Sequence, residues 1–320
     1  YGYNGNVDKT TSFRPLIDIS ATQNTYTHEI TSSISSFGNP TLRWEKTGTW
    51  DVGIDYSFWG NKLSGKLDLY NKKGKDLITS MTIPAINGTR SQKLNTAQMI
   101  NRGFELEVST RIPILASNIV WTGSLNFSYN KNKITNLYRV TYGSYDLYSG
   151  GSSAYVEGYN ANTLWAYKYA GVVNRGSEDD PYWLPAIHGA EGELFDFSDW
   201  TSGDARDYMV NMGTKVAPYT LGFSNSFKIY DFDLSFIITG KFGHKFRRCS
   251  FNYPDMSGGY AMPNKYYKEV LESDPMDMVP IPFDRREESY LYWNSYYPYL
   301  DYLVENASHV RIQEINLTYN

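Results

Sequence analysis

The sequence predicts an all-β protein, an open arc of an antiparallel transmembrane β-barrel with long loops at one end. Three observations support this prediction. Runs of about ten residues alternate apolar and polar side chains, short turns alternate with long connections, and aromatic residues make up 16% of the chain. Successive side chains of a strand point to opposite faces, so each run has one apolar and one polar face. A tilted strand of about ten residues crosses a bilayer.

The overall composition is compatible with a barrel and argues against other classes. No run among the 320 residues approaches the roughly 18 apolar residues of a membrane helix, whereas a barrel strand exposes only alternate residues to lipid. The formal net charge of −4 gives no basic footprint for nucleic acid. A single cysteine, Cys249, excludes an internal disulfide framework.

The N-terminal part of the chain has a weak pattern, and the clearest hairpin follows it. Only residues 16–21 within 1–38 suggest a strand. Residues 49–58 and 63–70 then alternate strongly, and Trp59-Gly60-Asn61-Lys62 joins them, because Gly and Asn adopt the positive φ of a tight turn. The expected outward set includes Trp50, Ile54 and Phe58, and the expected lumen-facing set includes Asp51 and Asp55.

Further strands and loops are predicted in order along the chain. Residues 71–94 are polar, with Pro84 and Asn87-Gly88 as breakers, and indicate a loop. Strands are predicted at 104–109, 121–129, 164–173, 219–227 and 232–238. In the first of these, Glu105 and Glu107 alternate with apolar residues and are expected to face the lumen.

Two details of the strand pattern need explanation. An even number of crossings must separate the strand at 121–129 from the one at 219–227, yet one strand, 164–173, is evident between them. Either a second strand lies near 138–142 or 203–212, or 164–173 does not span. In the last strand, the apolar residues have even numbers up to Ile312 and odd numbers from Ile315 onward. We therefore expect a β-bulge, with one extra residue, between Ile312 and Ile315.

Several ordered motifs resemble the TonB-dependent outer-membrane transporters of the SusC/RagA type. The longest is NP-x-L-x-WE-K-T, a G-x-D strand, a short turn and D-x-Y-N-K-K-x-x-D-L-I. The matching residues are Asn39, Pro40, Leu42, Trp44, Glu45, Lys46, Gly53, Asp55, Asp68, Tyr70, Asn71, Lys72, Lys73, Asp76 and Leu77. Further matches lie at 101–105, 127–134 and 158–172 and in the shifted closing strand, so the resemblance covers 39–173 and 216–320.

The resemblance implies an architecture and a function. Residues 1–320 would be an internal or C-terminal segment of one 22-stranded receptor β-barrel domain, with the plug domain and the outer strands outside it. The implied function is active import of oligosaccharides or oligopeptides across the outer membrane of a Gram-negative bacterium. The implied partners are a SusD-like surface lipoprotein, TonB acting through the plug, and the lipid bilayer.

Two other functions stay open on the sequence: a secreted or surface all-β carbohydrate-binding protein, and a secreted carbohydrate-active enzyme. Paired carboxylates can hydrolyse glycosides, but Asp51 with Asp55 and Glu105 with Glu107 are more simply the wet wall of a lumen. No nucleophile elbow, phosphate loop or zinc signature is present, and the four histidines lie far apart in the sequence. We therefore predict no enzyme activity and no cofactor, with one exception: Asp199, Asp204 and Asp207 are candidate calcium ligands in an acidic, Gly-bearing stretch.

The long connections are the candidate binding regions. Loops 130–160 and 244–306 lie opposite the short turns and are rich in aromatic residues, which offer apolar area with a polar tip. We expect these loops to form the outer mouth, and residues 264–272 to form a short helix there. The candidate substrate or partner contacts are Tyr145, Tyr148, Trp183, Trp200, Tyr253, Tyr260, Trp293, Tyr296 and Tyr297.

Overall fold

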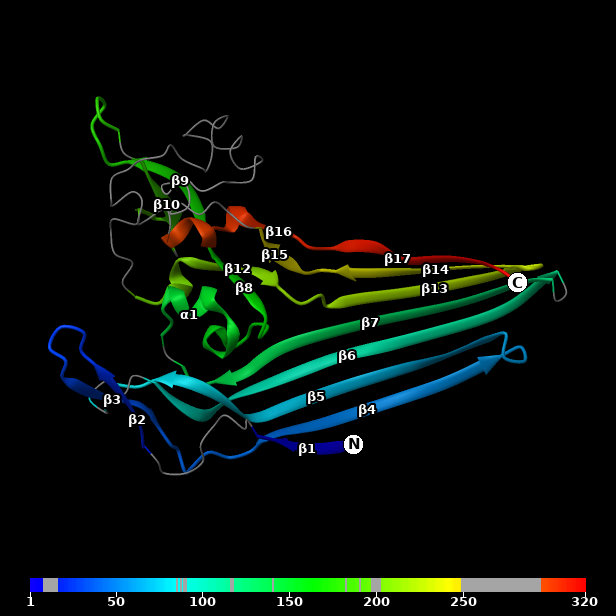
Figure 1. The fold of residues 1–320 in the computed structure, drawn as a ribbon, viewed down its shortest axis with the longest axis horizontal. Helices are drawn as coiled ribbons and strands as arrows, with labels where there is room; N and C mark the ends of the chain where they lie inside the picture. Colours follow the sequence, from blue (N-terminus) through cyan, green and yellow to red (C-terminus); the bar gives the residue numbers. More distant parts are fainter. Residues whose placement is uncertain are drawn as a thin grey trace.

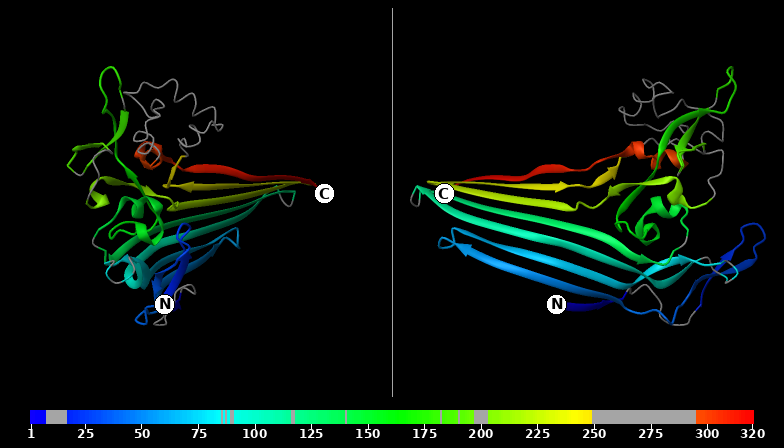
Figure 2. Two further views of the ribbon diagram at one scale, coloured as in Figure 1. Left: turned by 60° about the vertical axis from the view of Figure 1, so that its left-hand side comes forward. Right: turned by 180° about the vertical axis from the view of Figure 1, so that it is seen from behind.

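A computed structural model describes residues 1–7, 17–84, 86, 88, 91–115, 118–139, 141–181, 183–189, 191–196, 203–248 and 295–320. Within them, an eight-stranded antiparallel sheet forms a long curved wall (Figure 1, Figure 2). Its strands, in spatial order, are β1 (Gly2–Asn6), β4 (Glu45–Phe58), β5 (Leu63–Thr82), β6 (Ser91–Leu115), β7 (Ile119–Leu137), β13 (Tyr219–Ile229), β14 (Phe232–Phe242) and β17 (His309–Tyr319). The arc of an antiparallel barrel is confirmed.

Short turns gather at one end of the wall, the turn end, and long connections at the other, the loop end (Figure 1). Trp59, Gly60 and Asn61 all have positive φ, as predicted for the hairpin between β4 and β5. Tyr230, in the turn between β13 and β14, also has positive φ. Long loops and short turns therefore segregate as they do in bacterial barrels.

The strand count is settled by the pairing of β7 with β13, which are direct neighbours in the wall. The predicted strand 164–173 becomes β8 (Thr163–Tyr167) and β9 (Tyr169–Asn174), and neither belongs to the main sheet. β8 pairs with β12 (Met209–Thr214), and β9 pairs with β10 (Trp183–His188), which pairs with β11 (Leu194–Asp196). The segment 164–173 does not span.

Three expectations were wrong, and the first concerns the predicted loop 130–160, whose first eight residues are strand because β7 continues to Leu137. The predicted loop 71–94 is mostly strand, because β5 continues to Thr82 and β6 starts at Ser91. The alternation fades there because this part of the hairpin pairs through polar residues on both faces. The hydroxyls of Thr79 and Thr96, for example, lie 2.5 Å apart across the strands. The weak region at 1–38 also holds more strand than expected, since β2 (Ile17–Gln23) pairs with β3 (Ile30–Phe37) beside the loop end (Figure 1).

The two faces of the wall follow from the register, because directly opposed residues share a face. One row on the outer face consists of Ile54, Leu67, Leu106, Phe127, Leu221, Gly240 and Val310. Nothing covers the expected lipid-facing residues: Trp50, Ile54 and Phe58 are 56%, 58% and 53% exposed. Such an uncovered apolar face fits lipid contact and not the core of a sandwich.

The predicted bulge in the closing strand is present. Ile237 opposes Glu314 and Ile238 opposes Ile312, so Gln313 is the extra residue. The inserted residue keeps the apolar positions on both sides of it on the outer face. Without it, Ile315 and Leu317 would point to the polar side.

The long connections fold into a packed group at the loop end, which we name the loop cluster. It consists of β8 to β12 together with α1 (Ser144–Ser149), η2 (Gly151–Ala154), η3 (Ala205–Asp207), β15 (Lys245–Arg247), η4 (Tyr297–Tyr299), η5 (Asp301–Leu303) and β16 (Val304–Asn306). Its buried core includes Trp165, Tyr167 and Leu300 and continues into Ala97 and Ile134 of the wall. Ala97 and Ile134 lie on the face opposite the lipid-facing row, so the loop cluster covers the inner face at this end.

No helix among the described residues is both long and apolar enough to span a bilayer.

Candidate functional site

The inner face of the wall carries two adjacent rows of polar side chains. The first row is Asp55, Lys66, Glu107, Asn126, Gly222, Thr239 and Arg311. The second is Gly53, Asp68, Glu105, Ser128, Thr220, Lys241 and His309. Asp51, Asp55, Glu105 and Glu107 are exposed on this face, on the side opposite the lipid-facing residues, as the alternation predicts.

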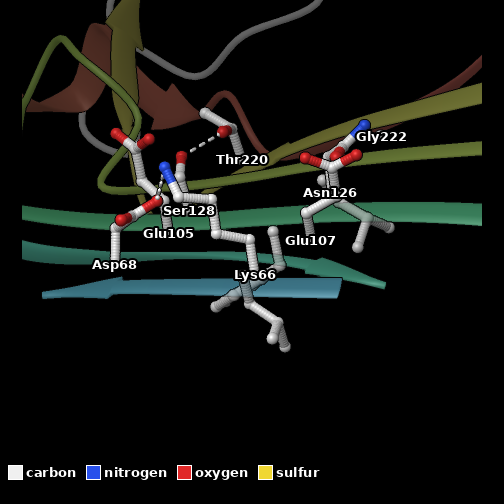
Figure 3. A pocket seen from close by; sticks show the side chains of 11 residues that line it. Lys66, Asp68, Glu105, Glu107, Asn126, Ser128, Thr220 and Gly222 are labelled. Atoms are coloured by element: carbon white, nitrogen blue, oxygen red, sulfur yellow. Dashed lines mark hydrogen bonds and ion pairs between the residues drawn. The ribbon is translucent and has the colours of Figure 1, made fainter. Parts of the chain in front are cut away.

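A pocket of about 500 Å³ opens on these rows and is bordered by residues of β5, β6, β7 and β13 (Figure 3). The Lys66 ammonium lies 2.9 Å from the Asp68 carboxylate, and the hydroxyls of Ser128 and Thr220 lie 2.6 Å apart. Glu105 and Glu107 take part in no ion pair that the described part of the chain shows, so their carboxylates are available to solvent or a ligand. The pocket offers mainly hydrogen-bond acceptors.

The glycine at position 53 makes room for one of these carboxylates. A Cβ atom on Gly53 would lie 2.5 Å from an Asp68 carboxylate oxygen, closer than any real contact. The G-x-D strand motif thus has a local reason: the missing side chain in β4 lets Asp68 in β5 lie flat across the strand pair and reach Lys66. Gly53 therefore helps to set the position of the Asp68 carboxylate.

Charge is unevenly distributed along the two rows. Carboxylates gather over β4 to β6, hydroxyl and amide groups occupy β7 and β13, and Lys241, His309 and Arg311 lie over β14 and β17. Side chains of one sign concentrate a field that selects the opposite charge on a ligand. The inner face thus presents separate regions for cationic and anionic groups of a solute.

The structure places the predicted loop aromatics in different surroundings. Tyr145 is 70% exposed, with its ring edge-on to Tyr148 at 5.5 Å between centroids. Tyr148 in turn stacks on Tyr299 at 3.7 Å. Tyr297 is 2% exposed within the loop cluster, and Tyr296 packs edge-on against Tyr167, so both serve the packing of the loops. Among the described aromatic candidates, Tyr145 presents the most open ring.

The remaining aromatic candidates have no described side chain. Trp183 is the first residue of β10, and its side chain is not among those described. Trp200, Tyr253, Tyr260 and Trp293, like the predicted helix at 264–272, lie outside the described residues. Contact with a substrate or partner stays a prediction for each.

The predicted calcium ligands are only partly visible. Asp204 caps η3 and accepts hydrogen bonds from Nε and Nη2 of Arg206, both at 2.8 Å. Burial would raise the pKa of Asp204, but the hydrogen bonds from Arg206 outweigh burial and hold that pKa below its usual range. Asp207 is exposed, and Asp199 lies outside the described residues. No cluster of three acidic, histidine or cysteine ligands occurs among the described residues, and calcium binding stays a prediction.

Sequence reasoning missed two groupings of basic residues. His244 and His309 lie far apart in the sequence, yet their rings lie 5.9 Å apart, because β17 pairs with β14 across a long gap in sequence. Burial, and then the nearby His309 and Lys241, lower the pKa of His244. In the sequence, the run from Lys241 to Arg248 was the available signal, since it is unusually basic.

The second grouping is Lys215 with Arg247, at the base of the loop cluster. Arg247 donates a 2.5 Å hydrogen bond to the Trp165 carbonyl and lies over the Tyr299 ring. Burial lowers the pKa of both basic groups, and Arg247 lowers that of Lys215 further. Neither side chain forms an ion pair with a carboxylate in the described part of the chain.

Comparison with known families agrees with this geometry. A family model described as "TonB dependent receptor-like, beta-barrel" matches residues 10–239. The chain belongs to this receptor-barrel family. Among curated relatives, TonB-dependent receptor P3 of Formosa agariphila is 25% identical over 300 residues, 90% of this chain and 28% of its own length. TonB-dependent receptor SusC of Bacteroides thetaiotaomicron is 33% identical over 154 residues, 44% of this chain and 15% of its own length.

Solved structures show the same fold for the receptor segment. The RagAB peptide transporter matches 99% of this chain and 33% of its own, with a TM-score of 0.66 and 22% identity. The RagAB peptide importer in an "open-open" state matches with a TM-score of 0.64 and 20% identity. The chain thus spans about a third or less of the proteins it resembles.

Proposed function

We propose that this receptor segment belongs to an outer-membrane importer of large nutrients in a Gram-negative bacterium. The proposed substrates are oligosaccharides or oligopeptides, and the proposed energy source is TonB acting through a plug domain. The observation that carries the proposal is the two-faced wall, with an uncovered apolar outer face and a charged inner face. A membrane barrel needs both faces at once, because lipid surrounds it and a polar solute crosses inside it.

The inner-face rows support the import of a polar solute. Their carboxylates, amides and hydroxyls can exchange hydrogen bonds with sugar hydroxyls or peptide groups, and their separated charges can orient a charged solute. We assign no catalytic role to the paired carboxylates, which here line the wall at a wide opening.

We also propose that a SusD-like lipoprotein covers the loop end. The loop cluster supports this, because it covers the inner face there and exposes aromatic surface such as Tyr145. Tyrosine-rich, mixed polar surfaces suit an interface that must open and close. Tyr145, Trp183, Trp200, Tyr253, Tyr260 and Trp293 are the proposed contacts for the lipoprotein or the substrate.

The test is a loop deletion in the full-length protein. Residues 250–294 are replaced by a short Gly-Ser linker, so that Tyr297, Leu300 and Leu303 of the loop cluster core are retained. We expect loss of lipoprotein co-purification and of oligosaccharide or oligopeptide uptake, while the barrel stays inserted. A matched control shortens the connection at 85–90, on the β5–β6 hairpin. Survival of both co-purification and uptake after the first deletion would contradict the proposal.

The alternative, a secreted or surface carbohydrate-binding protein, makes a different prediction. Such a protein would be recovered without detergent, and its apolar face would be covered by other protein. The exposed residues of the outer face, including Trp50, Ile54 and Phe58, argue against that solution state. Fractionation of cells that express the full-length protein separates the two functions.

A further inference from the structure

Near the loop end, the side chains of the outer face change from apolar and aromatic to basic. One outer row consists of Val52, Leu69, Phe104, Tyr129, Tyr219 and Phe242. Its rings contact one another across strands, with Tyr129 and Tyr219 4.9 Å apart and Phe104 and Tyr129 5.9 Å apart. Aromatic rows of this kind lie at the boundary between hydrocarbon and headgroups. The row therefore marks the depth at which the lipid headgroups begin.

On β6 and β7, the next outward-facing positions toward the loop end are basic, while β4 and β5 carry Trp50 and Asn71 in the same row. Arg102 on β6 opposes Lys131 on β7, one position beyond the aromatic row, and Lys133 opposes Ile100 one position further. All three basic side chains are exposed on the outer face. On β5, Lys73 opposes Ile100 and adds a fourth basic residue to this face. Long basic side chains can keep their stems on apolar surface while the charge lies among headgroups.

These side chains border a hollow and are not simply scattered. A pocket of about 230 Å³ is lined by Ile100, Arg102, Lys131, Lys133 and Thr135. β13 begins at Tyr219, opposite Tyr129 of β7, whereas β7 continues to Leu137. The pocket lies beside this part of β7, which has no paired β13 residues. The pocket thus combines the apolar side chain of Ile100, the hydroxyl of Thr135 and three cationic side chains.

No carboxylate of the described residues forms an ion pair with the cations of this pocket. Arg102 Nε lies 3.4 Å from the Asn71 side-chain oxygen, and the described part of the chain shows no ion pair for Arg102, Lys131 or Lys133. Three uncompensated cations in one hollow repel each other unless an anion joins them. Phosphate oxygens suit this set, because an arginine can bind them through two parallel hydrogen bonds and lysines add point charges.

We propose that Arg102, Lys131 and Lys133 form a binding site for a phosphorylated lipid headgroup of the leaflet at the loop end. The depth favours a lipid over a soluble anion, because the site adjoins the aromatic row and faces away from the lumen. The pocket is separate from the inner-face rows, so the site holds the barrel in its membrane and does not contact the solute. Basic pockets on membrane proteins commonly bind lipid headgroups in this way.

The experiment uses the full-length protein, purified in neutral detergent. The probes are lipid A, its dephosphorylated form, and inorganic phosphate, and binding is measured by native mass spectrometry and by titration. The test variant is Arg102→Gln/Lys131→Gln/Lys133→Gln. The control, Lys62→Gln/Arg111→Gln/Lys228→Gln, removes the same charge near the turn end. Electrophoretic mobility before and after heating checks that each barrel is folded.

We expect lipid A to bind the natural protein and the control equally, within twofold. The test variant should bind about fivefold more weakly per cation removed, or roughly 100-fold in all. The dephosphorylated lipid should bind at least tenfold more weakly than lipid A, and millimolar inorganic phosphate should not displace lipid A. If the triple variant does not fold, the single variant Lys133→Glu takes its place. Equal binding by test variant and control, equal binding of both lipids, or displacement by inorganic phosphate would each overturn the proposal.

Discussion

Asn225 is a polar residue on the lipid-facing side of the wall, and the neighbouring Trp121 explains how it is tolerated. Asn225 is 5% exposed, and its side-chain oxygen accepts a 3.1 Å hydrogen bond from the Trp121 indole. The indole also stacks with Phe227, at 6.4 Å between ring centroids, and so covers the amide. A buried polar atom without a partner costs free energy, so the indole hydrogen bond removes that cost for the Asn225 oxygen, whereas the Asn225 side-chain nitrogen has no partner in the described part of the chain.

The Trp121→Phe variant tests this residue-scale arrangement. Phenylalanine keeps an aromatic ring but removes the donor, so the Asn225 oxygen loses its partner in an apolar environment. We expect the folded barrel to lose about 1–3 kcal/mol in its free energy of unfolding. Urea unfolding of the full-length protein in lipid vesicles measures the change. In the double variant Trp121→Phe/Asn225→Leu most of the stability should return, and a double variant as unstable as Trp121→Phe would refute this role of the hydrogen bond.

At the scale of single strands, the sequence predicted faces better than boundaries. A strand in contact with lipid needs an apolar side chain at every second residue. This alternation is visible in the sequence without a structure. The same reasoning failed at 71–94, because a hairpin beyond the membrane has no such requirement and its polar strands resemble a loop. The pairing of His244 with His309 was equally hidden, since it depends on register between strands far apart in sequence.

A charge placed on each face of one strand tests the assignment. Ile54→Arg puts a cation on the lipid-facing side, where a midplane arginine costs about 2–4 kcal/mol. Its neighbour Asp55 points to the inner face, so Asp55→Ala should leave assembly unchanged. The measurement is the fraction of folded barrel, determined from the heat-dependent electrophoretic mobility. Equal assembly of the two variants would contradict the lipid-facing assignment of Ile54.

Asp301 makes the stability of the loop cluster depend on pH. Burial raises the pKa of its carboxyl, although backbone N–H groups of Tyr169 and Tyr302 partly offset that rise. The folded state therefore holds the Asp301 proton at a pH where the unfolded chain has released it. This contribution to stability is complete below the ordinary pKa of 3.8 and is lost as pH rises through the folded pKa.

The Asp301→Asn variant should remove this dependence. Asparagine is neutral at every pH and can still accept the 3.1 Å hydrogen bond from the Tyr169 N–H. We expect the variant to be more stable than the natural protein at neutral pH, with the difference vanishing below about pH 3.8. Chemical denaturation followed by tryptophan fluorescence between pH 3 and 7 measures both proteins. A difference that stays constant over this range would show that Asp301 does not titrate in this way.

At the scale of the whole molecule, the sequence predicted the wall but not how its charges or loops converge. That Asp51, Asp55, Glu105 and Glu107 share the face opposite the apolar residues followed from alternation alone, and their contact with a lumen stays a prediction. Their place opposite the basic groups of β14 and β17 required the register of seven strands. The loop cluster was less predictable still, because its core joins Trp165, Ile187 and Leu300 with Ile134 of the wall, and no periodicity links such distant residues.

The strands of the main sheet end at different heights at the loop end, so the edge of the wall is higher on one side than on the other. β5, β6 and β7 continue beyond the aromatic row, whereas β13 begins in that row and β14 ends there. At about 3.4 Å per residue, the eight residues from Asn130 to Leu137 raise the β7 side by roughly 27 Å along the strand. The folded connections stand on the low side of this edge, because β14 leads directly into β15 and β16 leads directly into β17 there, so the loop cluster and not the main sheet extends the wall on that side (Figure 1).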